Sequence, residues 1–291
     1  MTEYSGPSTA FTRLAPAVFV LLWSTGFIGA KFGLPYSEPF TLLWYRYGAV
    51  SLLLALVVTI LRLPLPRPVM WGHLAISGVL LHGLYIGGVF FAIKHGMSSG
   101  MSALIVGVQP LLTAGLVGPL FGEQVTRRQV AGFVLGFTGL AFTVSRSLAQ
   151  GQMPLVGFVS CVIALCAITA GTLYQKHYIK GVDLRVGTCI QFIATAIPFW
   201  LLSHTVETGV VEWHPHFVFA LTWLCLGLSL GAVSILWFLI KHGVAAKVAS
   251  LFYLVPPVTA LEGYYLFGET LTLVQMLGIF VTVLGVALIN G

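Results

Sequence analysis

Charged side chains are scarce in this sequence, at 8% of its 291 residues, whereas hydrophobic residues make up 58% and the mean hydropathy is +0.98. A soluble domain carries charged residues at about a quarter of its positions, because its surface must face water. The shortage of charge therefore excludes a soluble globular protein. We predict an all-α integral membrane protein, with the lipid bilayer as its surroundings.

Cysteines and reaction motifs are also few. The four cysteines lie inside apolar runs, with no pair at metal-binding spacing, so neither a disulfide nor a zinc site is predicted. A glycine-rich phosphate loop followed by Lys and Ser/Thr is missing, which argues against direct use of ATP. The His-Glu-x-x-His motif of metalloproteases is missing too. We therefore predict no enzyme activity, no cofactor and no metal.

One pattern occurs twice, at a spacing close to half the length of the chain. Such a period predicts two halves of the same architecture. The motif Ile-Lys-His-Gly recurs after 147 positions, and the proline and the Gly-Glu pair that follow it recur after 146 or 147. These landmarks are Ile93–Gly96 and Ile240–Gly243, Pro110 and Pro256-Pro257, and Gly122-Glu123 and Gly268-Glu269.

Ten apolar segments of membrane-spanning length follow a polar N-terminal tail, residues 1–13. They lie at 14–34, 40–61, 70–92, 97–121, 128–145, 155–176, 186–204, 216–239, 246–267 and 273–290. Five segments fall in each half, 14–146 and 155–290. Because five is odd, the second half enters the membrane from the opposite side. We therefore predict two inverted five-helix repeats around a central cavity, as in many secondary transporters.

Positive charge indicates the orientation. The net charge of +6 is spread over short connections without a basic run, so no nucleic-acid partner is predicted. With a cytoplasmic N-terminus, the inner connections hold Arg13, Arg62, Arg67, Arg127, Arg128, Lys176, Lys180, Arg185, Lys241 and Lys247. The outer side holds only Lys31, Lys94 and Arg146. This bias predicts that both termini are cytoplasmic.

Proline interrupts the fourth segment of each half. Pro110 lies near the centre of the first and Pro256-Pro257 near the centre of the second. Each proline removes a backbone donor, and the freed carbonyl groups need partners inside the bundle or in a wet cavity. Matched interruptions indicate a binding site and predict hinges at Pro110, Pro256 and Pro257. The alternative is a kink without function.

Three ionisable residues inside spans are candidates for proton coupling or polar contacts. Glu262 lies well inside the ninth segment, where a carboxylate suggests a proton relay or a partner for a substrate ammonium group. Lys31 and Arg46 lie nearer to segment ends, where long side chains can reach water. Lys31 aligns with Lys176, and Arg46 with Gln191, both at an offset of 145. Either could therefore be a repeated contact between helices.

Aromatic and amide residues inside the spans could form the wall of a substrate site. A cavity of this kind suits an apolar or aromatic solute with polar ends. Ordinary helix packing is the alternative, and a lone membrane histidine is more often a packed polar contact. The candidates for substrate binding are Trp23, His82, Tyr85, Gln109, Tyr174, Gln175, Trp237 and Tyr253.

The ordered motifs resemble the drug/metabolite transporter superfamily, and within it the EamA-type ten-helix permeases. The resemblance extends over nearly the whole chain and is strongest in Trp23-Ser24, Lys31, Tyr45-Arg46 and the two stretches from proline to Gly-Glu. It is most similar to YddG-type exporters of aromatic and other amino acids. The resemblance implies alternating access and export of a solute across the inner membrane. Glu262 departs from the family pattern, in which a small or apolar residue is expected.

We therefore predict an inner-membrane secondary transporter that exports amino acids, including aromatic ones. Protons are a possible coupling ion, and the protein is either a monomer or a homodimer. Other substrates stay open, among them another metabolite or drug, a nucleotide-sugar or a sugar phosphate. A membrane scaffold subunit without a solute path is the alternative from another class.

Overall fold

The computed structural model describes residues 9–121, 126–149, 151, 154–239 and 251–290. This part of the chain is helical, apart from an isolated bridge between Ser37 and Val211. The elements are α1 Thr9–Gly33, α2 Pro39–Ile60, α3 Pro68–Gly78, η1 Val79–Leu84, α4 Tyr85–Lys94, α5 Ser99–Gly107, α6 Gln109–Phe121, α7 Arg127–Ala149, α8 Leu155–Tyr178, α9 Leu184–Thr205, α10 Pro215–Thr222, η2 Trp223–Ala232, α11 Val233–Leu239, η4 Phe252–Leu254, α13 Val255–Phe267 and α14 Leu273–Asn290.

The hydropathy pattern predicted these helices well. Within the described residues, 7 helical stretches are long and apolar enough to cross a membrane, and Leu273–Leu288 is a shorter apolar helix. The predicted segments 128–145 and 273–290 are helical as α7 and α14, whereas 246–250 of the ninth segment lie outside the described residues. Helix α1 begins at Thr9, earlier than predicted. The all-α membrane fold is thus confirmed.

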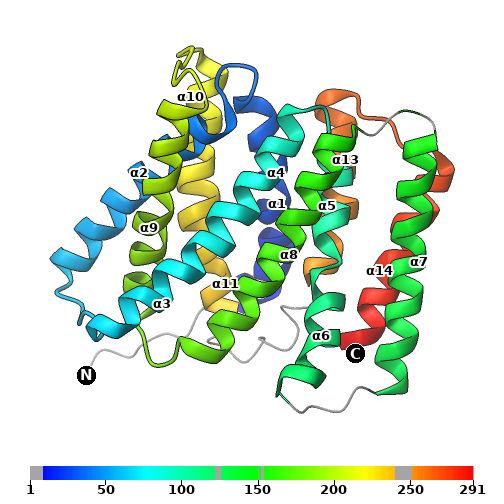
Figure 1. Ribbon diagram of the computed structural model, residues 1–291, viewed down its shortest axis with the longest axis horizontal. Coiled ribbons are helices and arrows are strands. Elements are labelled where there is room, and N and C mark those ends of the chain that lie inside the picture. Colours follow the sequence, from blue (N-terminus) through cyan, green and yellow to red (C-terminus); the bar gives the residue numbers. More distant parts are fainter. Residues whose placement is uncertain (1–8, 122–125, 150, 152–153, 240–250, 291) are drawn as a thin grey trace.

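Helices from the first half of the chain pack against helices from the second half. The main pairs are α7 with α14, α2 with α9, α4 with α8, and α5 with α13. Figure 1 shows α7 and α14 at one end of the molecule and α2 and α9 toward the other. In three of these pairs the two helices hold the same place in the order of their halves, namely second, fourth and fifth.

Small residues bring α7 and α14 into close contact. A Cβ atom added to Gly139 would lie 2.6 Å from the backbone nitrogen of Thr282 and 2.7 Å from the carbonyl oxygen of Gly278. A larger side chain at Gly139 would therefore push the helices apart. Glycines at such interfaces let backbones approach in a membrane, where the hydrophobic effect does not hold helices together.

The third spanning helix of each half contains a π-helical stretch, η1 between α3 and α4 and η2 between α10 and α11. In η1 the N–H of Tyr85 donates to the carbonyl of Leu80, five residues earlier. π-Helical turns widen a helix locally and occur frequently at functional sites. The apolar pattern of these stretches did not predict them.

The predicted proline interruptions fall at real breaks. Helix α5 ends at Gly107 and α6 begins at Gln109, so Pro110 lies in the first turn of α6. Pro256 and Pro257 lie in the first turn of α13, directly after the 3₁₀ turn η4. The first turn tolerates proline because its N–H groups have no partner within the helix. Movement at these breaks stays a prediction.

Candidate functional site

Arg46 of α2 is buried, with 4% of its surface exposed. Its Nε and Nη2 atoms donate to the Ser229 hydroxyl over 3.3 and 3.1 Å, and Nη1 is buried without a hydrogen-bond partner. The guanidinium carbon lies 5.2 Å from the centre of the Tyr47 ring. A cation from α2 thus meets the π-helical stretch η2.

A second set of polar side chains connects α3, η1, α8 and α9. The Gln191 side-chain amide donates to the Ser77 hydroxyl over 3.0 Å and to the side-chain amide oxygen of Gln175 over 3.1 Å, and Ser77 donates to the same oxygen over 3.0 Å. The His82 ring lies 4.8 Å from the Phe192 ring and 5.8 Å from the Tyr47 ring. Gln191 and Arg46 both lie close enough to His82 to interact with it.

These two sets correspond between the halves of the chain. His82 in η1 and Ser229 in η2 are 147 positions apart, the offset that relates Ile93 to Ile240. Arg46, which contacts Ser229, is aligned with Gln191, which lies beside His82. Each half therefore directs a long polar side chain of its second helix at the π-helical stretch of the other half.

At the predicted outer end, Lys31 of α1 forms an ion pair with Glu269. Glu269 also accepts from the backbone N–H and the hydroxyl of Ser99, over 3.0 and 2.8 Å. Burial alone would raise the pKa of Glu269, but the hydrogen bonds from Lys31 and Ser99 outweigh it and leave the pKa below its usual value. The cluster joins α1, α5 and the end of α13.

The repeated Gly-Glu pair explains how Glu269 reaches this place. Gly268 has φ 64°, a left-handed conformation that ends α13 and that glycine adopts without strain. The N–H of Glu269 then bonds back to the carbonyl of Gly263 over 3.2 Å, which turns its side chain toward α1 and α5. The first copy of the pair, Gly122-Glu123, lies outside the described residues, as do Ile240–Gly243.

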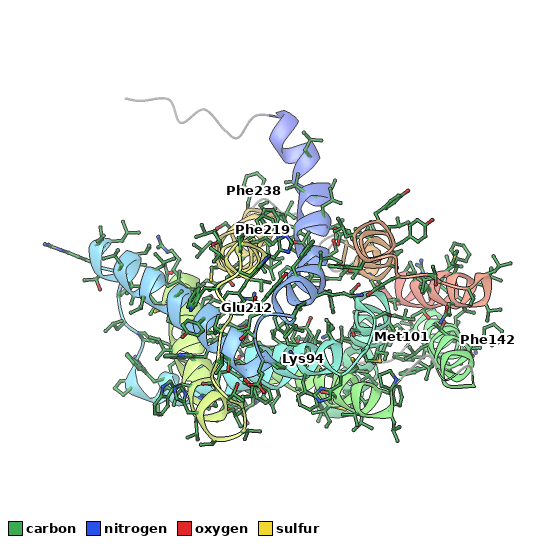
Figure 2. The ribbon with its side chains drawn as sticks, turned by 90° about the horizontal axis from the view of Figure 1, so that it is seen from above. Lys94, Met101, Phe142, Glu212, Phe219 and Phe238 are labelled. Carbon is green, nitrogen blue, oxygen red and sulfur yellow. The ribbon has the colours of Figure 1, made fainter. Side chains whose placement is uncertain are left out.

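Further contacts hold the same end together. Lys94 donates to the carbonyls of Leu34 and Ser37 over 2.7 and 3.2 Å. Figure 2, which views the molecule from this end, shows Lys94 near its middle and Phe142 at the far side of α7. Glu207 accepts from the backbone N–H groups of Phe40 and Thr41 over 2.8 and 2.7 Å. The predicted outer end is therefore held by polar contacts between the halves.

Glu262 lies on α13 and faces α1. It accepts from the Ser24 hydroxyl over 2.7 Å through Oε1, while Oε2 is buried without a hydrogen-bond partner. Glu262 is thus a half-satisfied carboxyl group in the interior. Tyr264, two residues further along α13, is exposed and does not complete the partners of Glu262.

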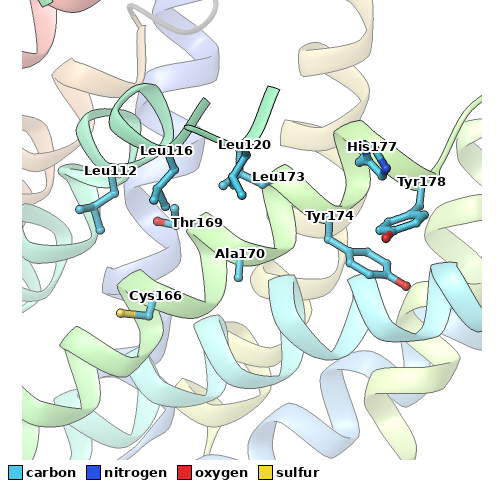
Figure 3. A pocket seen from close by; sticks show the side chains of 10 residues that line it. All are labelled: Leu112, Leu116, Leu120, Cys166, Thr169, Ala170, Leu173, Tyr174, His177 and Tyr178. Carbon is cyan, nitrogen blue, oxygen red and sulfur yellow. The ribbon is translucent and has the colours of Figure 1, made fainter. Parts of the chain in front are cut away.

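A cleft of about 630 Å³ separates α6 from the last turns of α8. Figure 3 shows Leu112, Leu116 and Leu120 on one side and Tyr174 on the other. The complete lining is Leu112, Leu116, Leu120, Cys166, Thr169, Ala170, Leu173, Tyr174, His177 and Tyr178. A second cavity, of about 360 Å³, is lined by Leu81, Thr172, Gln175, Lys176 and Ile179. Both lie beside the predicted inner half of α8.

The other sequence candidates do not all converge on one site. Tyr85 is buried in the central core, and Trp23 packs against Phe252 with the ring centres 5.1 Å apart. Gln109 donates to Thr113 over 2.8 Å. Tyr174 pairs with Nδ1 of His73 over 2.8 Å, where the direction of donation depends on the tautomer. The backbones of Trp237 and Tyr253 belong to α11 and η4, but their side chains lie outside the described residues.

Several polar residues of the site were not predicted. Ser77, Gln191 and Ser229 complete the central contacts, and Ser24, Ser99 and Glu269 complete those at α1. The internal repeat could have indicated Gln191 and Glu269 as site residues, because Gln191 aligns with Arg46 and Glu269 aligns with Glu123. The serines carry no comparable signal, because serine is common in membrane helices.

The stretch Gly96-Met97-Ser98-Ser99-Gly100 has the Gly-x-Ser-x-Gly spacing of serine hydrolases. That motif acts where a strand turns into a helix, whereas α4 precedes this stretch. The Ser98 hydroxyl caps α5 by accepting from the N–H of Met101 over 3.2 Å. Ser98 is therefore a helix cap. No group of three His, Cys, Asp or Glu residues that could hold a metal occurs within the described residues.

Comparisons with known proteins agree with this architecture. The model of the EamA-like transporter family matches residues 14–145 and again residues 155–291. A transporter of Archaeoglobus fulgidus is 30% identical, covering 95% of this chain and 96% of its own. A probable amino-acid metabolite efflux pump of Salmonella typhimurium is 24% identical over 89% of this chain and 88% of its own. The inner membrane transporter YedA of Escherichia coli is 26% identical over 96% and 92%.

A solved crystal structure has the same fold, with a TM-score of 0.65 and 20% identity over 97% of this chain and 98% of the other. The matched family, the helical bundle and the apolar spans lead to one conclusion. The chain is a multi-pass membrane protein that belongs to the EamA-like transporter family of the drug/metabolite transporter superfamily.

Proposed function

We propose that this protein is a secondary transporter that exports amino acids, including aromatic ones, across the inner membrane by alternating access. Residues 14–146 and 155–290 form two inverted repeats in this proposal, with both termini cytoplasmic. The similarity to an amino-acid metabolite efflux pump supports the substrate class. The pairing of second, fourth and fifth helices between the halves supports the inverted repeats.

Two helix contacts hold equivalent places in the two halves, and the difference between them supports the proposal. In each contact, the first helix of one half meets the fourth spanning helix of the other half. Helix α1, the first of one half, meets α13 of the other, and Ser24–Glu262 and Lys31–Glu269 join that contact. Helix α8, the first of the second half, meets α6, and there a cleft of about 630 Å³ lies at the predicted inner side. In an inward-open state, the contact at the outer side is expected to be closed and its counterpart at the inner side is expected to be open. The α1–α13 contact and the cleft between α8 and α6 match this arrangement. Exchange of the two arrangements would carry solute outward.

The two cavities supply the entry route in this proposal. Tyr174 lines the larger cavity and Gln175 lines the smaller one. Gln175 accepts a hydrogen bond from Gln191, which in turn lies beside His82. Aromatic walls with a few amide groups suit a solute that has an apolar body and polar ends. The exposed apolar faces of the spans meet the bilayer lipid.

Glu262 is the residue that we propose to carry a coupling proton. Its Oε2 atom is buried and unpartnered, so the group has room to bind a proton without breaking a second contact. Its one hydrogen bond, from Ser24, crosses from α1 to α13, so a change in protonation acts on the contact that must open. Intramembrane carboxyl groups commonly have this role in transporters.

The test is transport by the purified protein in liposomes. Labelled tryptophan, phenylalanine and threonine are followed with and without an imposed pH gradient, for the wild type, Glu262→Gln and Glu212→Gln. Glu212 is an exposed carboxyl group and serves as the control. We expect saturable flux driven by the gradient, and in Glu262→Gln we expect exchange of amino acids to persist without gradient-driven accumulation.

Three results would each contradict a part of the proposal. If no amino acid crosses the membrane, the substrate class is wrong and a wider metabolite panel is needed. If the gradient drives wild-type and Glu262→Gln flux equally, Glu262 is not the proton site. Flux that ignores the gradient in both proteins would indicate facilitated export.

A further inference from the structure

Arg46 differs from every other charged side chain for which the structure describes contacts. Its guanidinium group is buried, and two of its three nitrogen atoms converge on a single acceptor, the Ser229 hydroxyl. The third, Nη1, is buried without any hydrogen-bond partner. Guanidinium normally presents its donors as a fork that matches a carboxylate. In Arg46 the N–H donors on Nη1 have no acceptor.

No carboxylate among the described residues compensates this charge. Glu269 is engaged by Lys31 and Ser99, Glu262 accepts from Ser24, and Glu207 accepts from Phe40 and Thr41. The groups around Arg46 are instead neutral or aromatic: Ser229, Tyr47, His82, Tyr85 and Cys225. An uncompensated cation at this depth is costly, and a protein that retains one usually uses it.

The surroundings of Arg46 indicate the shape of the missing partner. Tyr47, His82 and Phe192 form a cluster of rings, with centres 5.0 to 5.8 Å apart around Tyr47 and 4.8 Å between His82 and Phe192. An anionic group at Nη1 would therefore have an apolar, aromatic region next to it. Such a combination suits a monocarboxylate with a hydrophobic or aromatic body.

Phosphate esters fit less well. A phosphate carries about two negative charges and is generally held by several cations. Lys31 is the other predicted cation of the central spans, and it is paired with Glu269. One guanidinium group with one free donor edge matches the single charge of a carboxylate.

We propose that Arg46 binds the carboxylate of the transported solute, through Nη1 and through donors released from Ser229, and that the site therefore selects monocarboxylates. This inference rests on the proposed function and gives its substrate a recognition group. The solute would arrive from the cavity of about 360 Å³ at Gln175, along Gln191 and His82. Binding would bring a counter-charge to the contact between α2 and η2.

The test compares acids with matching amides. Melting temperatures of the detergent-purified protein are measured with phenylalanine, phenylalaninamide and 3-phenylpropanoate, for the wild type, Arg46→Gln, Arg46→Lys and Arg185→Gln. Position 191, which matches position 46 in the other half, is a glutamine that is hydrogen-bonded inside the bundle. We therefore expect the folded protein to accept glutamine at position 46. Arg185 is an exposed cation paired with Asp183, and its replacement changes the net charge equally.

We expect both carboxylates to stabilise the wild type and Arg185→Gln, and the amide to have little effect. Arg46→Gln should bind the acids roughly tenfold more weakly or worse, and Arg46→Lys should recover part of the affinity. Equal binding of acid and amide by the wild type, no binding of either, or unchanged binding by Arg46→Gln would overturn the inference. Absence of amino-acid flux in liposomes would reject the proposed function alone, because 3-phenylpropanoate tests Arg46 without it.

Discussion

Three charged side chains in the spans, Lys31, Glu262 and Arg46, differ in how completely their polar atoms are partnered. Lys31 reaches Glu269, and the pair is completed by Ser99. Glu262 has a partner for one oxygen atom only, and Arg46 has none for Nη1. A complete cluster can hold two helices together, whereas an incomplete one has capacity for a proton or a ligand. We therefore propose a structural role for Lys31 and functional roles for Glu262 and Arg46.

The Lys31–Glu269 pair predicts how the stability of the outer end depends on pH. The pKa of Glu269 is lowered in the folded protein, so the pair stabilises it at pH values above the usual glutamate pKa of about 4.3. This contribution is lost as the pH falls through the lowered pKa. Glu269→Gln should reduce the free energy of unfolding at pH 7 by about 1–3 kcal/mol, because the pair is partly buried.

Melting temperatures measured from pH 7 to pH 3 would check this expectation. The wild type should lose its advantage over Glu269→Gln as the pH falls. Asp183→Asn is the control, because the Asp183–Arg185 pair lies at the surface and should matter much less. A difference between wild type and Glu269→Gln that stays constant as the pH falls would contradict a stabilisation that depends on the charge of Glu269.

At the scale of elements, hydropathy predicted where helices lie but not their irregularities. The breaks at Pro110 and Pro256 could be predicted because proline removes a donor wherever it occurs. The π-helical stretches η1 and η2 could not, because their apolar residues suit an α-helix equally well. Likewise, no sequence pattern shows that Arg46 meets Ser229, since 183 positions separate them.

The proline breaks should affect the rate of transport more than binding. Pro110→Ala and the double substitution Pro256→Ala with Pro257→Ala allow the preceding helices to continue, which stiffens the fourth spanning segment of each half. We expect maximal flux to fall several-fold with little change in KM. Pro198→Ala is the matched control, because Pro198 lies inside α9, a helix outside these segments. If all three substitutions lowered the flux equally, the breaks at Pro110 and Pro256-Pro257 would not act as hinges.

At the scale of the whole molecule, helices of the first half pack against helices of the second half. The family model matches each half separately, and contacts between the halves cover both ends of the bundle. Length and hydropathy were enough to predict the all-α membrane fold, whereas the inverted relation of the two halves stays a prediction. They could not predict side-chain contacts such as Lys31–Glu269, because these form between residues far apart in sequence.

The proposed function requires exchange between inward-open and outward-open states. Spin labels placed in a cysteine-free background at Pro35 and Thr270 report on the predicted outer end, and labels at Thr126 and Lys180 report on the inner end. All four positions are exposed and lie outside the proposed site. Distance distributions are measured in liposomes with and without phenylalanine.

We predict that phenylalanine shortens the Thr126–Lys180 distances and lengthens the Pro35–Thr270 distances, because closing one end accompanies opening the other. Arg46→Gln should give no such shift at the same phenylalanine concentration. Distances that stay fixed at both ends, in a protein that transports phenylalanine, would contradict alternating access.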